Sequence, residues 1–292
     1  MSLSGQGRIA LLSPPSTFRD PRVTILISSF DGFKECWPAV CHGFLKYWPD
    51  CPFEVRLMTN ELDFEHPLVR VLKTTGGKVW ADRLIHAMSV IRTPYVMYFQ
   101  EDYWIRERVD SARILGYVDL MDRENLNYLR LLANPRPDAP YPADSRLGIL
   151  ADDAPYRTSS QIALWRGDVL RELLRPGESV WDFELAGSTR SARYSSSFVS
   201  VWDRDGDDYF HGISYVCTAI NNGLWARPAV EYARRENVAI DFSTRPIETG
   251  WHEFLRTPRG RAIRKWTHRV RLLVSNPVAF ARKAKARLPG SP

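Results

Sequence analysis

YVMYFQEDY, residues 95–103, is a run of five apolar or aromatic side chains that leads into two adjacent acids, Glu101 and Asp102. Five bulky residues without polar alternation predict a strand that is covered on both faces. Ligands in open α/β sheets collect beyond the carboxyl ends of such strands. Two carboxylates there suit a divalent cation, Mg²⁺ or Mn²⁺, and through it a diphosphate. A solvated strand end followed by a turn is the alternative interpretation.

The residues before this strand alternate between strand and helix patterns. Strands are predicted at residues 23–30, 53–58 and 68–72, and helices at 33–47 and 78–91. A strand, helix, strand order implies a right-handed crossover between parallel strands. The sequence therefore predicts an α/β fold, a three-layer αβα sandwich with a mostly parallel central sheet and a ligand site at the strand ends.

The second half of the chain is less regular and shows no internal repeat. Its patterns are read as helices at 109–123 and 168–174, strands at 126–132, 158–165, 198–202 and 213–216, and a Ser- and Arg-rich loop at 187–197. An acidic turn is expected at 203–208. The motifs of dinucleotide oxidoreductases, phosphate-loop nucleotidases and α/β-hydrolases are missing, which argues against these three classes.

Composition limits the class of protein further. With 44% hydrophobic and 12% aromatic residues in 292, the chain can bury a large core. No stretch approaches the ~20 consecutive apolar residues of a membrane span, and the first residues lack the apolar core of a signal peptide. We expect a flexible N-terminus (1–20), one large domain (21–255) and a cytoplasmic location.

The C-terminal residues 256–292 form a basic amphipathic extension by their pattern. Arg and Lys are dense from Arg256 to Arg287, no acid follows Glu253, and apolar residues are interleaved. A helix or helix pair broken at Asn276-Pro277 is predicted. Such a segment suits an anionic membrane surface, here the inner face of the plasma membrane. A basic tail packed on its own domain is an equal alternative, and nucleic acid is disfavoured because no recognition motif accompanies it.

Four pieces of the chain occur in an order typical of one enzyme family. They are ILISSFD at 25–31, Trp80 to Arg83 ahead of a helix, YFQEDY at 98–103 and WDFE at 181–184. Together they resemble nucleotide-sugar-dependent glycosyltransferases with the GT-A fold, of the bacterial polysaccharide or lipopolysaccharide type. That family usually carries Asp-x-Asp, whereas this chain has Gln100-Glu101-Asp102, which puts strict metal dependence in question.

The resemblance implies a donor site for a nucleotide-sugar. Its residues would be Ser28, Ser29, Asp31, Asn60, Trp80, Asp82, Arg83, Glu101, Asp102 and Tyr103. A guanidinium suits phosphate geometry, so Arg83 is expected to reach ribose or phosphate. Trp80 is equally well explained as a core residue. The metal ligands would be Asp102 and Glu101. Some members of the family use a late histidine as an additional metal ligand, and His211 would take that role here.

Catalysis in the inverting branch of this family requires a carboxylate that deprotonates the acceptor hydroxyl. Asp182 and Glu184 are the candidates, and Glu184 is favoured; on a helix, positions two apart point in different directions, so only one would face the substrate. Helix-start carboxylates are the alternative. The expected activity is transfer of a sugar to a glycan or lipid-linked glycan acceptor, with retention still open. The second hypothesis is a non-catalytic carbohydrate- or membrane-surface-binding protein that retains the fold.

Overall fold

The computed structural model describes residues 19–74, 79–202, 211–216 and 218–250. These residues divide into two compact units. Unit 1 comprises the described residues up to 219 together with 231–241, and unit 2 comprises 220–230 and 242–250. Most of the expected flexible N-terminus, the acidic turn at 203–208 and the basic extension at 256–292 lie outside the described residues.

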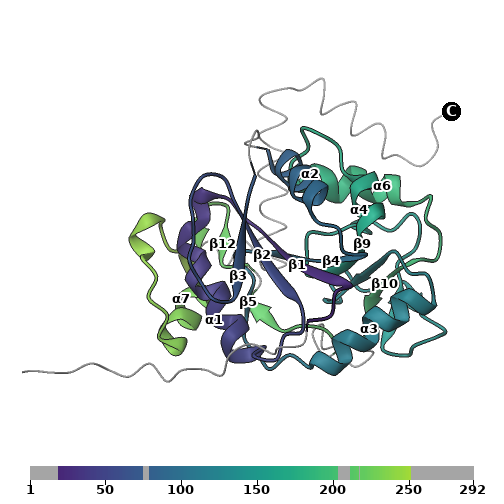
Figure 1. Cartoon of the computed structure of the whole chain (residues 1–292), viewed down its shortest axis with the longest axis horizontal. Helices are drawn as coiled ribbons and strands as arrows, with labels where there is room; N and C mark the ends of the chain where they lie inside the picture. The colour runs from purple at the N-terminus through teal and green to yellow at the C-terminus, as the bar shows by residue number, and fades with distance from the viewer. Residues whose placement is uncertain (1–18, 75–78, 203–210, 217, 251–292) are drawn as a thin grey trace, which may run out of the picture. The chain divides into compact units, whose positions relative to one another are not determined.

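Unit 1 contains a nine-stranded sheet with helices on both faces (Figure 1). Its strands are β1 (Val23–Ser28), β2 (Glu54–Thr59), β3 (Val69–Lys73), β4 (Tyr95–Gln100), β6 (Tyr128–Arg130), β7 (Ala139–Pro140), β8 (Leu147–Ile149), β9 (Ala163–Arg166) and β10 (Phe198–Val201). Its helices are η1 (Asp31–Cys36), α1 (Trp37–Tyr47), α2 (Trp80–Val90), α3 (Ser111–Arg123), α4 (Gly167–Leu173), α5 (Val180–Asp182), the π-helix η2 (Phe183–Gly187) and α6 (Ser188–Ser191). A separate antiparallel pair joins β5 (Trp104–Ile105) to β11 (Tyr215–Val216).

Unit 2 is small and is described by itself. It contains an antiparallel hairpin of β12 (Ile220–Asn221) and β13 (Leu224–Trp225) and the short 3-10 helix η3 (Phe242–Thr244). Helix α7 (Arg227–Glu236) begins in this unit and ends in unit 1.

The predicted α/β fold with a mostly parallel sheet is confirmed. The strand order is β3-β2-β1-β4-β9-β6-β10-β8-β7. The first four strands pair in parallel, and β6 pairs in parallel with β10. Only β9 and β8 run against the others, because each pairs antiparallel with both of its neighbours. Seven of the nine strands therefore share one direction.

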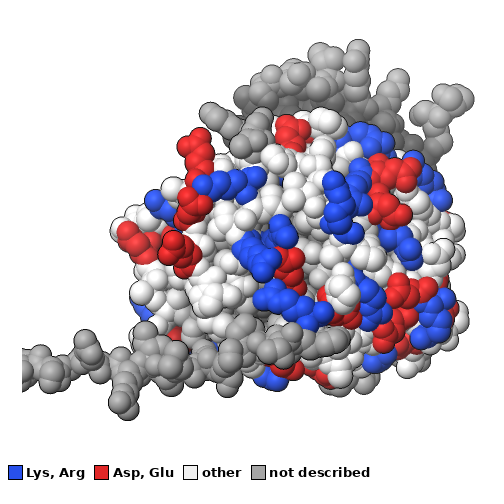
Figure 2. All heavy atoms as spheres, viewed as in Figure 1, with Lys and Arg blue, Asp and Glu red and all other residues white. Residues whose placement is uncertain are grey.

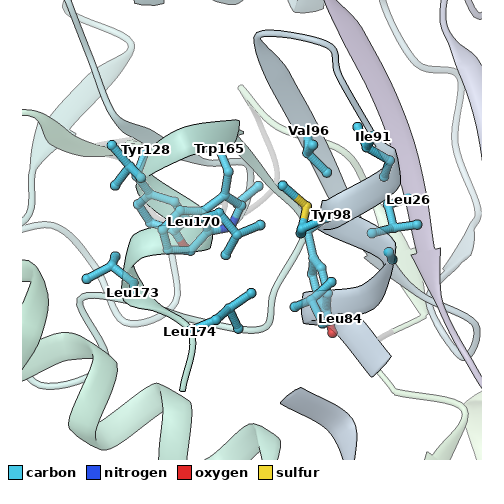
Figure 3. Packing of buried hydrophobic residues seen from close by; sticks show 14 of the residues in the cluster. Leu26, Leu84, Ile91, Val96, Tyr98, Tyr128, Trp165, Leu170, Leu173 and Leu174 are labelled. Carbon is cyan, nitrogen blue, oxygen red and sulfur yellow. The ribbon is translucent and has the colours of Figure 1, made fainter. Parts of the chain in front are cut away.

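Helices cover both faces of the sheet, as a three-layer sandwich requires. Alternate residues of β1 and β4, including Leu26 and Tyr98, pack with Leu84 of α2 and Leu170 of α4 in one buried cluster (Figure 3). On the other face, the rings of Phe99 in β4 and Phe44 in α1 lie 5.2 Å apart. Helix α3 covers the same second face, since Tyr95 in β4 donates a hydrogen bond to Asp122 at 2.6 Å.

Strand β4 is buried on both faces, as its sequence predicts. The first five residues of β4 are at most 2% exposed, and the sixth, Gln100, is partly exposed. All six residues of β1 are buried as well. The acids that follow β4 therefore begin where the covered part of the sheet ends.

The strand order reverses beside β1. The chain proceeds from β1 to β2 and β3 on one side and then places β4 on the other side of β1. In open α/β sheets this switch point leaves a crevice outside the carboxyl ends of the two strands, where ligands bind. Here those ends are Ser28 and Gln100, which are register partners.

Two predictions for the second half of the chain are wrong in part. The strand predicted at 158–165 begins only at Ala163, because the hydroxyl side chain of Thr158 and the backbone of Ser160 bond to the helical segment 183–188. The loop predicted at 187–197 begins with the end of a helix, since α6 continues η2 as far as Ser191.

The end of α7 is fixed to α1 by one buried carboxylate. The side chain of Glu236 is 2% exposed and accepts hydrogen bonds from Lys46, from Tyr47 at 2.8 Å and from Arg235 at 2.9 Å, with the ring of His42 at 3.3 Å. Burial raises the pKa of Glu236, but these donors outweigh it and lower the pKa from 4.5 to about 2. The ionised form is therefore the one that stabilises unit 1.

Replacing Glu236 with glutamine lowers the free energy of unfolding by about 1–3 kcal/mol near neutral pH. Because the folded pKa lies below the unfolded one, this contribution is complete above the unfolded pKa of 4.5 and is lost as the pH falls toward about 2. Urea unfolding of wild type and variant should converge as the pH is lowered. The exposed Glu231 on the same helix gives the control Glu231→Gln, and an equal effect in both variants would contradict the assignment.

Candidate functional site

The ends of three parallel strands meet at one edge of the sheet. The carbonyl of Ser28 in β1 accepts a hydrogen bond from the backbone N–H of Glu101 at 3.3 Å. The carboxylate of Asp31 accepts from the backbone N–H groups of Asn60 and Glu61 after β2, both at 2.9 Å. The sequence-predicted residues at 28–31, 60 and 101 are therefore neighbours in the fold.

Asp31 ties two of these loops together. Burial raises the pKa of Asp31, but the backbone donors of Glu61, Asn60 and Leu62 outweigh it, and the pKa is lowered from its ordinary value. Its oxygens are thus engaged with the loop after β2. Asp31 therefore shapes the loops of the predicted donor site, and its contact with a nucleotide stays a prediction.

Glu101 and Asp102 are both buried at the end of β4, at 7% and 5% exposure. The hydroxyl of Thr218 donates to the carboxylate of Asp102, and the backbone N–H of Ala219 donates to its carbonyl at 2.9 Å. The ring of the next residue, Tyr103, lies 4.8 Å from that of Tyr215. The interpretation of this stretch as a solvated strand end is therefore excluded, because both acids are almost fully covered.

Arg83 of α2 lies near Glu101. It is 7% exposed, its guanidinium lies 4.8 Å from the ring of Phe30, and it interacts electrostatically with Glu101. Its Nε is buried and makes no hydrogen bond within the described part of the chain. Burial lowers the pKa of Arg83, with Glu101 opposing the shift. A buried guanidinium N–H without a hydrogen-bond partner is costly, and an anionic ligand would satisfy it.

Three other predicted donor-site residues make internal contacts. The indole nitrogen of Trp80 donates to the hydroxyl of Tyr98 at 3.0 Å, and that of Trp37 donates to Ser29 at 2.8 Å. Asp82 accepts from the backbone N–H of Gly177 at 2.9 Å. These internal contacts are enough to explain the residue types at Ser29, Trp80 and Asp82 without a bound ligand.

The two candidate bases point in different directions, because residues 180–191 are helical. Asp182 is exposed and closes a capping box with Ser179. Glu184 turns toward the sheet, where its Oε1 accepts from the backbone N–H and the hydroxyl of Ser160 at 2.8 and 2.6 Å. The carbonyl of Ser160 in turn accepts from the side chain of Gln100 at 3.4 Å. Glu184 is therefore connected to the acid-tipped strand, and Asp182 is not.

His211 is placed by a different set of contacts. Its carbonyl accepts from the hydroxyl of Tyr117 in α3 at 2.8 Å, and its charge contributes to the lowered pKa of Asp144. The described residues contain no group of three or more His, Cys, Asp or Glu side chains arranged to hold a metal ion. His211 does not complete such a group with Glu101 and Asp102.

Sequence reasoning missed two residues that position this site. Thr218 reaches Asp102 across 116 positions of sequence, and Ser160 holds Glu184 from a segment that was predicted as a strand. The sequence around a single serine or threonine in a polar stretch does not indicate which distant carboxylate its hydroxyl will bond. The contacts become visible only when the topology brings the segments together.

The sequence matches no protein-family model and no curated protein. Similar solved structures include residues 1–349 of TarS from S. aureus, at 12% identity over 64% of this chain and 59% of that chain, with a TM-score of 0.43. Another is a mannosyltransferase from Pyrobaculum calidifontis in complex with GDP-Man and Mn²⁺, at 11% identity over 73% and 61%, with a TM-score of 0.42.

A third similar structure is a cytidylyltransferase from Leptospira borgpetersenii, at 12% identity over 79% of this chain and 99% of that chain, with a TM-score of 0.42. This chain spans less than two thirds of the length of the TarS fragment and of the mannosyltransferase. Values this low do not assign the chain to a family.

Proposed function

We propose that this protein is a glycosyltransferase that moves a sugar from a nucleotide-diphosphate donor to a glycan or lipid-linked glycan acceptor by inverting displacement. The observation that carries the proposal is the convergence of buried charged groups at the switch point of the sheet. Glu101 and Asp102 are buried there, Arg83 interacts electrostatically with Glu101, and Glu184 is linked to the same strand end through Ser160 and Gln100. The resemblance of the four motifs supplies the substrate class.

The donor set at the end of β4 fits a divalent cation. Mg²⁺ binds through one or two carboxylates together with substrate phosphates, so a site of only Glu101 and Asp102 agrees with the lack of a larger ligand group in the described residues. When bound, Mg²⁺ or Mn²⁺ would supply positive charge against the diphosphate. Arg83 supplies a fixed positive charge from the protein itself.

The reaction requires one proton acceptor and a stabilised leaving group. Oε1 of Glu184 is fixed by Ser160, and Oε2 makes no hydrogen bond within the described part of the chain. We assign Oε2 as the atom that takes the proton of the acceptor hydroxyl. The hydroxyl oxygen then bonds to the anomeric carbon while the bond from that carbon to the diphosphate breaks, and Arg83 stabilises the departing charge.

A thermal-shift screen tests the donor assignment. The full chain is heated with uridine, guanosine, cytidine or thymidine diphosphate, with and without Mn²⁺. A ligand that binds only the folded state raises the unfolding temperature, so one base class should produce a shift. If none of the four diphosphates does so under either condition, the donor assignment is wrong.

The basic extension is proposed to bind an anionic membrane surface. Residues 251–292 contain 11 Arg or Lys and one Glu. On the face of the described residues shown in Figure 2, acidic and basic side chains are interspersed. No helix in the described ranges is both long and apolar enough to span a membrane. The proposed membrane attraction is supported by the charge of the extension and not by the mixed charges of that face.

The full chain should sediment with phosphatidylserine-containing vesicles. About 0.5 M salt should release it into the supernatant, because screening weakens attraction between exposed charges. A chain truncated after residue 250 should stay in the supernatant. Equal sedimentation with purely zwitterionic vesicles would contradict the electrostatic assignment.

A further inference from the structure

A cavity lies on the outer side of the helical segment that carries Glu184. Its volume is about 370 Å³, within the range of ~300–1,000 Å³ that small-molecule sites occupy. One wall is the loop 152–156 after β8, and the other is formed by Leu185 of η2 and by α6. Glu184 and Leu185 are adjacent, so the cavity and the candidate base share one turn of helix.

The loop wall is held by two fully buried arginines. Arg157 donates to the carbonyls of Leu150 at 3.2 Å and Tyr194 at 2.8 Å, and to Asp152 at 2.8 Å. Arg130 donates to the carbonyl of Tyr156 at 3.2 Å. Both arginines are 0% exposed. The loop is thus anchored from the core, and the cavity wall is preformed.

Tyr156 lies in this wall with an unfavourable backbone. Its φ is +58°, a left-handed conformation that costs a bulky residue about 1–2 kcal/mol. Its side chain is nevertheless 43% exposed rather than packed in the core. Strained residues concentrate at functional sites, where the strain fixes a side chain in a required place. Here the fixed group is an aromatic ring at the cavity.

The opposite wall carries two further signs of a binding site. Residues 183–187 form a π-helix, a rare local structure that is frequent at functional sites. Leu185 within it lines the cavity and is 57% exposed. Gly187 lets η2 pack closely against Thr158, because a Cβ at position 187 would lie 3.0 Å from the hydroxyl oxygen of Thr158. Exposed large apolar groups at a cavity indicate a ligand surface.

We propose that this cavity binds the acceptor, specifically a neutral pyranose ring of a glycan. Tyr156 and Leu185 offer apolar surface to the C–H face of a sugar. The exposed carboxylate of Asp153 in the same wall can accept hydrogen bonds from sugar hydroxyls and disfavours anionic ligands. An isoprenoid chain would pack against the apolar side chains of the cavity, but it has no hydrogen-bond donor for Asp153. This assignment rests on the proposed transferase function, because Leu185 of the cavity wall directly follows Glu184 in the helix. Glu184 itself turns toward Ser160 and does not line the cavity, so the ring bound here is a non-reacting unit of the acceptor glycan.

Saturation-transfer NMR on the full chain tests the proposal. The probes are methyl glycosides of glucose, galactose, mannose, rhamnose and N-acetylglucosamine, each at millimolar concentration. At least one should receive saturation on its ring C–H protons, and Tyr156→Gly should reduce that signal at least about fivefold. The variant should fold, since glycine adopts positive φ freely. Asn125, with φ of +53° after α3, provides the matched control Asn125→Gly, which should leave the signal unchanged.

Three results would overturn the proposal. They are no saturation of any glycoside by wild type, an undiminished signal in Tyr156→Gly, and saturation of only the alkyl chain of octyl glucoside, which would indicate a lipid site. The diphosphate screen separates this failure from failure of the proposed function. Diphosphate binding without glycoside binding rejects the acceptor cavity alone, whereas glycoside binding without diphosphate binding rejects the transferase and leaves a carbohydrate site.

Discussion

Replacing Glu184 with glutamine reduces kcat for sugar transfer by about 10²–10⁴-fold, the range typical for loss of a general base. Glutamine keeps an oxygen that accepts the two hydrogen bonds from Ser160, so the fold and the position of the side chain are retained. Only the capacity to take a proton is removed. The measurement is kcat at saturating donor and acceptor, together with the unfolding temperature and the affinity for the nucleoside diphosphate, both of which should match wild type.

Asp182 provides the discriminating comparison, because it lies on the same helical segment. It is exposed and bonded to Ser179, so Asp182→Asn should weaken the capping box and lower the unfolding temperature slightly without a large loss of kcat. If Asp182→Asn abolishes transfer while Glu184→Gln leaves it intact, the assignment of the base is wrong.

Replacing Arg83 with methionine weakens binding of the nucleoside diphosphate by about 10–100-fold, because charge-assisted hydrogen bonds to phosphate contribute about 1.5–3 kcal/mol. The same substitution also lowers the free energy of unfolding of the ligand-free protein, because it leaves the buried carboxylate of Glu101 without this positive neighbour. Loss of diphosphate affinity in a variant that is still folded is the expected signature.

Titration calorimetry and urea unfolding of the Arg83→Met variant measure the two effects. Arg92→Met is the control, since Arg92 follows the same helix and is exposed. A large loss of stability in Arg83→Met with unchanged diphosphate affinity would show that the guanidinium serves the fold through Glu101 and Phe30 instead.

The first hundred residues could be predicted from sequence because their strands carry clear apolar patterns, continuous in β1 and β4 and interrupted by charged residues in β2 and β3. β1 and β4 are covered on both faces, so burial imposes the same residue type at every position. The later part was less predictable because its elements are short. β5, β7 and β11 have two residues each, and their pairing depends on partners far away in the chain. Tertiary context decides such strands.

The sequence predicted where the residues of the candidate site lie in the fold better than it predicted what each residue does there. The sequence placed Glu101 and Asp102 at a strand end, and the structure adds that both are buried. It did not reveal that Asp31 and Asp82 bond to backbone N–H groups, since a carboxylate that shapes a loop has the same letter as one that binds a ligand. Choosing between Asp182 and Glu184 required knowing that this segment is helical, because the helix sets the direction of each side chain.

Release of nucleoside diphosphate from nucleotide sugars tests the central claim most directly. The full chain is incubated with UDP-, GDP-, CDP- and dTDP-sugars, with and without Mn²⁺, beside a Glu101→Gln, Asp102→Asn double variant. The account predicts release from one base class by wild type and at least a ~100-fold slower release by the double variant, because these acids lie where the leaving group must be stabilised. Binding of a donor without release would favour the non-catalytic alternative. Release that is equal in wild type and double variant would contradict the account.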